Sequence, residues 1–204
     1  MKHIVFFITF MLSFGANCAF SYDYSKVTDD HRIIAALKVF ETTDSKDALE
    51  RVFAKDSKGR YTKILFYDLG MVCFEYKKHF AAYCTDDFGD SVILIHSKYR
   101  NSPKEALAAV IAHESTHKIE AQMATKNPSK TALKTNLSEE IEATLNEVRQ
   151  WNKSLVNKPE LRESNDDTLI QRLNNLAMIY NHSGDRAISE NIVNNSFYKE
   201  QLKL

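Results

Sequence analysis

Apolar residues recur along the chain in two spacings, which predict helices at both ends and strands between them. Helical spacing marks residues 29–40 and, over a shorter stretch, residues 45–54. Four stretches rich in β-branched and aromatic residues follow, and turn residues separate them, so they predict a small antiparallel sheet of about four strands. These stretches cover residues 63–69, 71–76, 80–85 and 91–96.

A helical pattern starts near Pro103 and carries two histidines on its apolar side. Ser102 is suited to cap this helix, and Glu105 is placed to close a capping box with it. Beyond the cap, the apolar positions fall on the same stripe as His113 and His117. Both histidines are therefore expected to point toward the interior of the protein.

Further helices are predicted after this one, and together with the sheet they predict an α+β fold. One helix begins at Ser138, and the others cover residues 167–180 and 185–204. Gly and Pro are few, and no repeat or low-complexity tract divides the chain. Residues 20–204 are therefore expected to form a single domain.

Residues 113–117 read His-Glu-Ser-Thr-His, which is the HExxH motif placed on a predicted helix. His113 and His117 lie one turn apart and point the same way, so their imidazoles can bind one Zn²⁺. Glu114 is suited to be the general base that takes a proton from a metal-bound water. The alternative is a pair of core histidines, but burying two imidazoles and a carboxylate together without a metal is costly. Zinc-dependent hydrolysis is therefore the leading hypothesis.

A catalytic zinc site needs a third protein ligand besides the two histidines. The positions that a metzincin fills with Gly and His hold Glu120 and Met123, which excludes that class. Over roughly residues 92–156 the chain instead resembles the gluzincin class of zinc metallopeptidases, in which a later helix carries an ExxA-type glutamate. Glu140, with Ala143 three residues later, matches that pattern. The resemblance implies that Glu140 is the third zinc ligand.

Other acidic residues keep alternatives open at this site. Glu139, Glu142 and Glu120 are the fallback ligands, in that order, because acidic residues are also common in a first helical turn. Glu147 lies two turns after the proposed ligand and is either the partner of a ligating histidine or a solvated charge. Many gluzincins follow the alanine with an Asp that helps to orient a histidine, whereas this chain has Thr144.

The resemblance also implies a zincin-like fold, in which the small sheet lies beside the metal helix and an edge strand holds extended substrate by backbone pairing. Residues 92–96 are the candidate edge, so His96 lies either near the cleft or at the surface. Related enzymes commonly take a donor for the oxyanion from their C-terminal part. Tyr180 and His182, at the end of a predicted helix, are the candidates for that role.

The N-terminus predicts export to a periplasmic or extracellular location. Residues 1–19 combine a basic start, an apolar run and a small-residue segment, as a secretory signal peptide does. The run is too short for a comfortable membrane span, so no stable membrane insertion is expected after cleavage. Lipidation of Cys18 is the less favoured alternative, because Asn17 precedes it. In an oxidising compartment Cys73 and Cys84 are expected to form a disulfide, with free thiols as the alternative.

The charge balance narrows the class of partner. Lys plus Arg and Asp plus Glu each number 27, and this zero net charge argues against nucleic acid or an anionic membrane as the main partner. The leading hypothesis is an exported zinc peptidase acting on a peptide or protein substrate. A zinc-binding protein of peptidase fold that recognises a partner without cutting it is the second hypothesis, which the intact Glu114 disfavours. A secreted structural domain without metal is the third.

Overall fold

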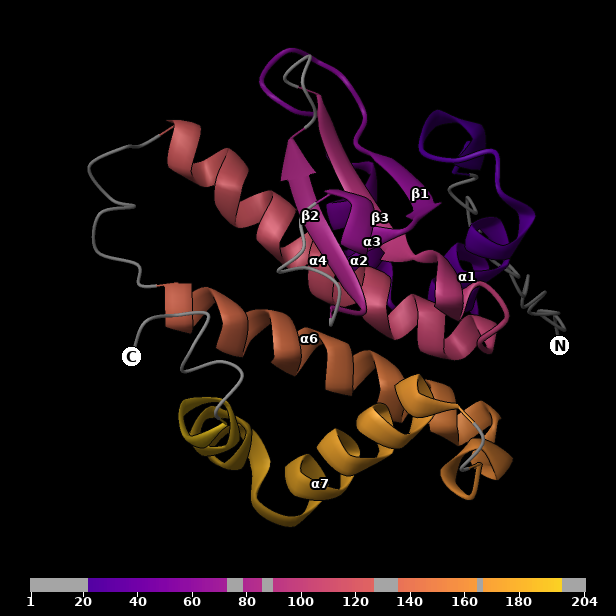
Figure 1. Ribbon diagram of the computed structural model, residues 1–204, viewed down its shortest axis with the longest axis vertical. Coiled ribbons are helices and arrows are strands. Elements are labelled where there is room, and N and C mark those ends of the chain that lie inside the picture. The colour runs from indigo at the N-terminus through magenta and orange to yellow at the C-terminus, as the bar shows by residue number, and fades with distance from the viewer. Residues whose placement is uncertain (1–21, 73–78, 86–89, 127–135, 165–166, 196–204) are drawn as a thin grey trace, which may run out of the picture.

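The computed structural model describes residues 22–72, 79–85, 90–126, 136–164 and 167–195 of the chain (Figure 1). Within these residues it has six α-helices and a three-stranded sheet, so the predicted α+β class is confirmed. The α-helices are α1 (His31–Thr42), α2 (Lys46–Phe53), α3 (Leu69–Val72), α4 (Lys104–Lys126), α6 (Asn136–Asn157) and α7 (Thr168–Asn194). The strands are β1 (Lys63–Tyr67), β2 (Ala81–Thr85) and β3 (Ser91–His96). Short 3-10 helices cover Tyr24–Lys26, Ser97–Tyr99 and Pro159–Arg162.

Capping side chains mark the starts of the helices, and a glycine marks a kink. Asp30 caps α1 and Asp167 caps α7, each accepting hydrogen bonds from the backbone N–H groups two and three residues later. Ser102, the expected cap of α4, donates its hydroxyl to Asp167 and so ties the starts of α4 and α7 together. Element α7 consists of two helical runs that meet at a kink at Gly184, whose φ of 69° favours glycine, so the predicted break between two C-terminal helices is found. Residues 196–204, the end of the second predicted helix, lie outside the described residues.

The sheet differs from the prediction in its pairing. Its order is β1-β3-β2, with β1 parallel and β2 antiparallel to β3, so the expected antiparallel sheet is wrong. A short connection makes β2 and β3 an antiparallel pair, whereas β1 pairs on the far side of β3 and runs parallel to it. Consequently β3 is the central strand, and residues 92–96 are not an edge.

The predicted strand over residues 71–76 begins as a helix. Asp68 turns the chain after β1, because its side chain accepts from the N–H of Gly70 and its carbonyl accepts from the N–H of Met71. The result is the short helix α3. Residues 73–78 lie outside the described part of the chain.

Helix α4 is the central element of the fold. Figure 1 shows α6 and α7 on one side of it and the sheet on the other, and α1 and α2 also pack against it. Every residue from 105 to 116 is buried. A helix that is covered all round belongs to a core, so the motif residues of α4 lie inside the protein.

Two predictions fall on residues that the structure does not describe. The signal peptide over residues 1–19 lies outside the described part, and so does Cys73 of the expected disulfide. Both remain predictions. Among the described helices, none combines the length and the apolar character that crossing a bilayer requires.

Lys118 joins α4 to α2 from within the core. Its side chain is fully buried, and its Nζ donates to the carbonyl oxygens of Arg51 and Val52, at 2.9 and 2.7 Å. These carbonyls lie in the last turn of α2, where helix carbonyls lack intrahelical partners and a positive charge is favoured. Burial lowers the pKa of Lys118 to about 8. The contact fixes α4 at the position next to His117.

Replacing Lys118 by Met should lower the free energy of unfolding by about 2–4 kcal/mol, because the side chain keeps its length while two carbonyl oxygens lose their donor. Urea denaturation measures this loss. Lys104→Met, at an exposed position of the same helix, is the control and should stay within about 0.5 kcal/mol of the wild type. Equal stabilities of the two variants would show that the Lys118 contact contributes nothing.

Candidate metal centre

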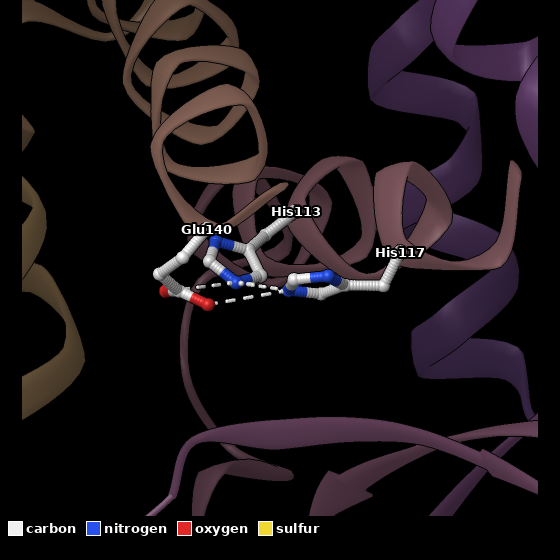
Figure 2. Close-up of side chains that lie close together, drawn as sticks. All are labelled: His113, His117 and Glu140. Carbon is white, nitrogen blue, oxygen red and sulfur yellow. Dashed lines mark hydrogen bonds and ion pairs between the residues drawn. The ribbon is translucent and has the colours of Figure 1, made fainter. Parts of the chain in front are cut away.

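The three predicted ligands converge between α4 and α6 (Figure 2). The Nε2 atoms of His113 and His117 lie 3.1 Å apart. The carboxylate of Glu140 places Oε1 3.5 Å from Nε2 of His113 and Oε2 3.4 Å from Nε2 of His117. Tetrahedral zinc with ligands at about 2.0–2.1 Å separates its ligand atoms by about 3.3 Å. The three side chains therefore fit a metal ion, and they form the group among the described residues that is able to hold one.

The charges around this cluster favour a divalent cation. Glu114, Glu140 and Glu147 are all buried, with exposed fractions of 6%, 8% and 1%. Arg172 offsets the charge of Glu147, while Glu114 and Glu140 lie beside the two imidazoles. Buried carboxylates are unfavourable unless they are paired or coordinate a metal. A divalent ion between the ligands would offset two negative charges at once.

The pKa values at the cluster reflect two opposing effects, burial and the charges of neighbouring side chains. Burial lowers the pKa of His113, but Glu140 and Glu147 outweigh burial and raise it to about 9. Burial raises the pKa of Glu140, but the two histidines reverse this effect and hold it well below its usual range. The carboxylates thus favour a positive charge between the helices, which a proton on His113 supplies in part. A metal ion has to displace that proton.

Glu147 and Arg172 hold the ring of His113 from its other nitrogen. Nδ1 of His113 lies 3.3 Å from Oε2 of Glu147. Arg172, on α7, donates to both oxygens of Glu147, and the Nη2–Oε2 distance is 2.8 Å. Burial raises the pKa of Glu147, but Arg172 and His113 hold it well below its usual range. Glu147 is therefore a buried, ionised partner of a ligand histidine, the role that carboxylates often take beside metal sites.

Glu147, and not Thr144, is the residue of α6 whose side chain reaches Nδ1 of His113. Thr144 is fully buried and carries no charge to orient a histidine. Glu147, three residues later on the same face of α6, brings a carboxylate to Nδ1 of His113. Glu147 therefore lies where it can orient His113, about one turn after Thr144.

Sequence reasoning missed Arg172. Its position lies three residues after Leu169 and four before Leu176, so a charged residue falls on a buried apolar stripe. Such a charge signals a buried partner. The sequence does not identify that partner, because Glu147 lies on a different helix, 25 residues earlier.

The other sequence candidates lie in different surroundings. Glu142 is exposed and accepts a hydrogen bond from Asn146, and Glu139 is partly exposed. Tyr180 hydrogen-bonds to Arg149. His182 is exposed. No contact among the described residues brings Tyr180 or His182 to the three ligands, and their oxyanion role stays a prediction.

His96 is buried and not a surface residue. Its Nδ1 accepts from the N–H of Lys98, and its Nε2 lies 4.0 Å from Asp68. The first contact lies within the turn after β3, and the second places that turn next to the turn after β1 at the end of the sheet.

Comparisons with known proteins give no match. No protein family matches the chain, and no similar chain is found among curated proteins or solved structures. The gluzincin resemblance therefore depends on the residues of α4 and α6 alone.

Glu140→Ala should weaken metal binding by at least about tenfold, because it removes one of three converging ligand atoms. Glu142→Ala is the matched control, since its position points about 160° away on the same helix and should change the affinity by less than about twofold. A competition titration against a zinc-binding dye measures both affinities. Equal effects of the two substitutions would show that Glu140 is not a ligand.

Metal affinity should rise with pH up to about 9, by about tenfold per pH unit, and then level off. The raised pKa of His113 means that its proton has to leave before Nε2 can bind a metal. Calorimetric titrations in buffers of different ionisation enthalpy count the released protons. An affinity that stayed constant between about pH 7 and pH 9 would contradict this assignment.

Proposed function

We propose that the protein is an exported zinc metallopeptidase of the gluzincin type that hydrolyses peptide bonds. The observation that carries this proposal is the convergence of His113, His117 and Glu140, with ligand atoms 3.1 to 3.5 Å apart. Three protein ligands leave the fourth position of a tetrahedral zinc open, as catalytic sites do. When bound, zinc supplies Lewis acidity that polarises a peptide carbonyl and lowers the pKa of a water molecule.

Glu114 is the proposed general base. It is buried on the helix that carries both histidines, and its own position points about 100° away from His113. Burial raises the pKa of Glu114, and the two histidines partly oppose this effect. A carboxylate with a raised pKa is better able both to accept a proton from water and to return it to the leaving amine.

The proposed place for an extended substrate is strand β2, in place of the edge first predicted. Strand β2 pairs with β3 on one side, and no strand pairs with its other side among the described residues. It also packs against α4, the helix that carries the histidines. An extended peptide added to this edge would therefore run along the metal centre, with backbone hydrogen bonds supplying affinity.

A metal-binding protein without activity on the same scaffold is the competing function. Such a protein would need the three ligands, but it would not need Glu114 as a general base. Burying a carboxylate beside the ligands is unfavourable, and metal binding alone does not require it. Its presence therefore supports hydrolysis.

The test compares zinc content and hydrolysis. Wild-type protein should carry one zinc per chain by elemental analysis and should cleave casein, an unstructured protein. Glu114→Gln should keep its zinc and lose activity by about 10²–10⁴-fold, because the residue moves a proton and does not ligate. Glu50→Gln, at an exposed position of α2, is the control and should keep both properties.

Two outcomes would contradict this proposal. Zinc loss from Glu114→Gln as large as the loss from His113→Ala would make Glu114 a ligand and not a base. Wild-type protein with one zinc and no activity would favour the competing function.

A further inference from the structure

Arg172 contacts two parts of the protein at once, the carboxylate beside the metal ligands and the segment that leads into β2. It donates to both oxygens of Glu147, with an Nη2–Oε2 distance of 2.8 Å. Its guanidinium also lies over the ring of Phe80, 4.9 Å from the ring centre. A guanidinium suits this double contact, because its planar fork matches a carboxylate and its face can stack on an aromatic ring.

The helix that carries Arg172 is fixed against α6 by contacts of its own. Leu173, the next residue, is fully buried in the core. The side chain of Asn174 accepts from the indole N–H of Trp151, on α6, at 3.0 Å. The guanidinium thus reaches Glu147 from a backbone that is itself held in place.

The contact with Glu147 leads to a metal ligand. Oε2 of Glu147, the oxygen that Nη2 of Arg172 binds, also lies 3.3 Å from Nδ1 of His113. This carboxylate is buried, so water does not stand in for either partner. A shift of the guanidinium would therefore move the oxygen that holds the His113 ring.

The contact with Phe80 leads to the proposed substrate strand. The carbonyl of Phe80 accepts from the N–H of His96 at 2.9 Å, and Ala81, the next residue, is the first of β2. The Phe80 ring also stacks on Tyr99, with centroids 5.0 Å apart. Tyr99 and Arg172 thus hold the side chain at the point where β2 begins.

These contacts give the metal centre and β2 a shared element that each can order. Once Nε2 of His113 ligates a metal, its ring stops turning and Nδ1 keeps Glu147 in place. Glu147 in turn holds Arg172 against the Phe80 ring. Ordering already present at one site does not have to be supplied again when the other site binds. Because such coupling is reciprocal, metal binding should favour the pairing of a peptide with β2, and a paired peptide should favour metal binding.

We infer that Arg172 is a positioning residue that couples metal binding at His113 to the ordering of strand β2. This inference rests on the proposed function, which supplies the metal and the substrate edge. Arg172 acts through Glu147 and Phe80, and it makes and breaks no bond in the reaction.

The zinc affinity of the full-length protein, measured by competition with a zinc-binding dye, tests the link from the side of the sheet. Phe80→Leu should weaken zinc binding by about three- to tenfold, because it removes the ring under Arg172 and keeps an apolar side chain. Phe66→Leu is the matched control, since Arg100 lies over the Phe66 ring at 4.5 Å but pairs with Asp30. This control should change the zinc affinity by less than about twofold.

A double-mutant cycle assigns the effect to Arg172. Arg172→Met should weaken zinc binding by about 10–100-fold, and adding Phe80→Leu to it should change the affinity by less than about twofold, because the contact is already lost. Arg172→Lys should recover part of the affinity, since it restores the charge beside Glu147 but not the planar fork. Thermal melts show which variants are folded, and Arg172→Lys replaces Arg172→Met in the cycle if the latter is not. Fully additive effects would overturn the coupling.

Hydrogen exchange tests the link in the other direction. Zinc should slow amide exchange over residues 81–85 of the wild type by at least about threefold, because ordering reaches β2 through Arg172 and Phe80. Phe80→Leu should lose most of this protection. Strand β1, on the far side of β3, is the internal control in each sample. Equal protection of β1 and β2, unchanged in Phe80→Leu, would show general stabilisation by zinc and would contradict the inference.

The outcomes separate this inference from the proposed function. If wild-type protein binds zinc and Phe80→Leu matches Phe66→Leu in zinc affinity and in the protection of β2, Arg172 couples nothing, while the proposed function stands. If wild-type protein binds no zinc, both fail. If it binds zinc and shows the coupling but does not cleave casein, the coupling is supported and the competing metal-binding function takes the place of hydrolysis.

Discussion

The rest of the structure depends on a helix that is covered on every side and still carries polar groups. Residues 105 to 116 of α4 are all buried, and the helix brings His113, Glu114 and Lys118 into the core. Each buried polar group has to find a partner there, because water is excluded. Lys118 binds the carbonyls that end α2, and His113 lies against Glu147 of α6. The partners of α4 therefore determine where its neighbours lie.

Arg172 extends this constraint to the C-terminal helix and to the sheet. It binds Glu147 with two donors and places its guanidinium over the ring of Phe80. A buried ion pair of this kind adds little net stability, but removing one partner leaves an uncompensated charge and costs about 3–5 kcal/mol. The pair thus acts mainly on geometry, since it allows one orientation of α7 relative to α6. Through Glu147 that orientation reaches His113, so α7 supports the candidate metal site.

The helices and the ligand set could be predicted because their signals are local. Spacing places His113 and His117 on one side of one helix, and the resemblance supplied Glu140. The capping residues Asp30 and Asp167 set helix starts within a few residues of the sequence pattern.

The sheet could not be predicted in the same way, because strand pairing joins distant segments. The patterns of residues 63–69 and 91–96 do not say that these segments run parallel and side by side. Arg172 was missed for a related reason. It acts through a contact between elements that are far apart in the sequence, namely its pair with Glu147.

The change of edge strand alters which residues can face a substrate. With β3 at the edge, His96 would have been the histidine beside the cleft, but β3 is central and His96 packs against the turns at the end of the sheet. With β2 at the edge, the unpaired side of the sheet belongs to a strand that packs against α4. Pairing order thus decides which strand can add an extended peptide to the sheet. Because Phe80 is held by both β3 and Arg172, the network that orients His113 also fixes the segment that leads into β2.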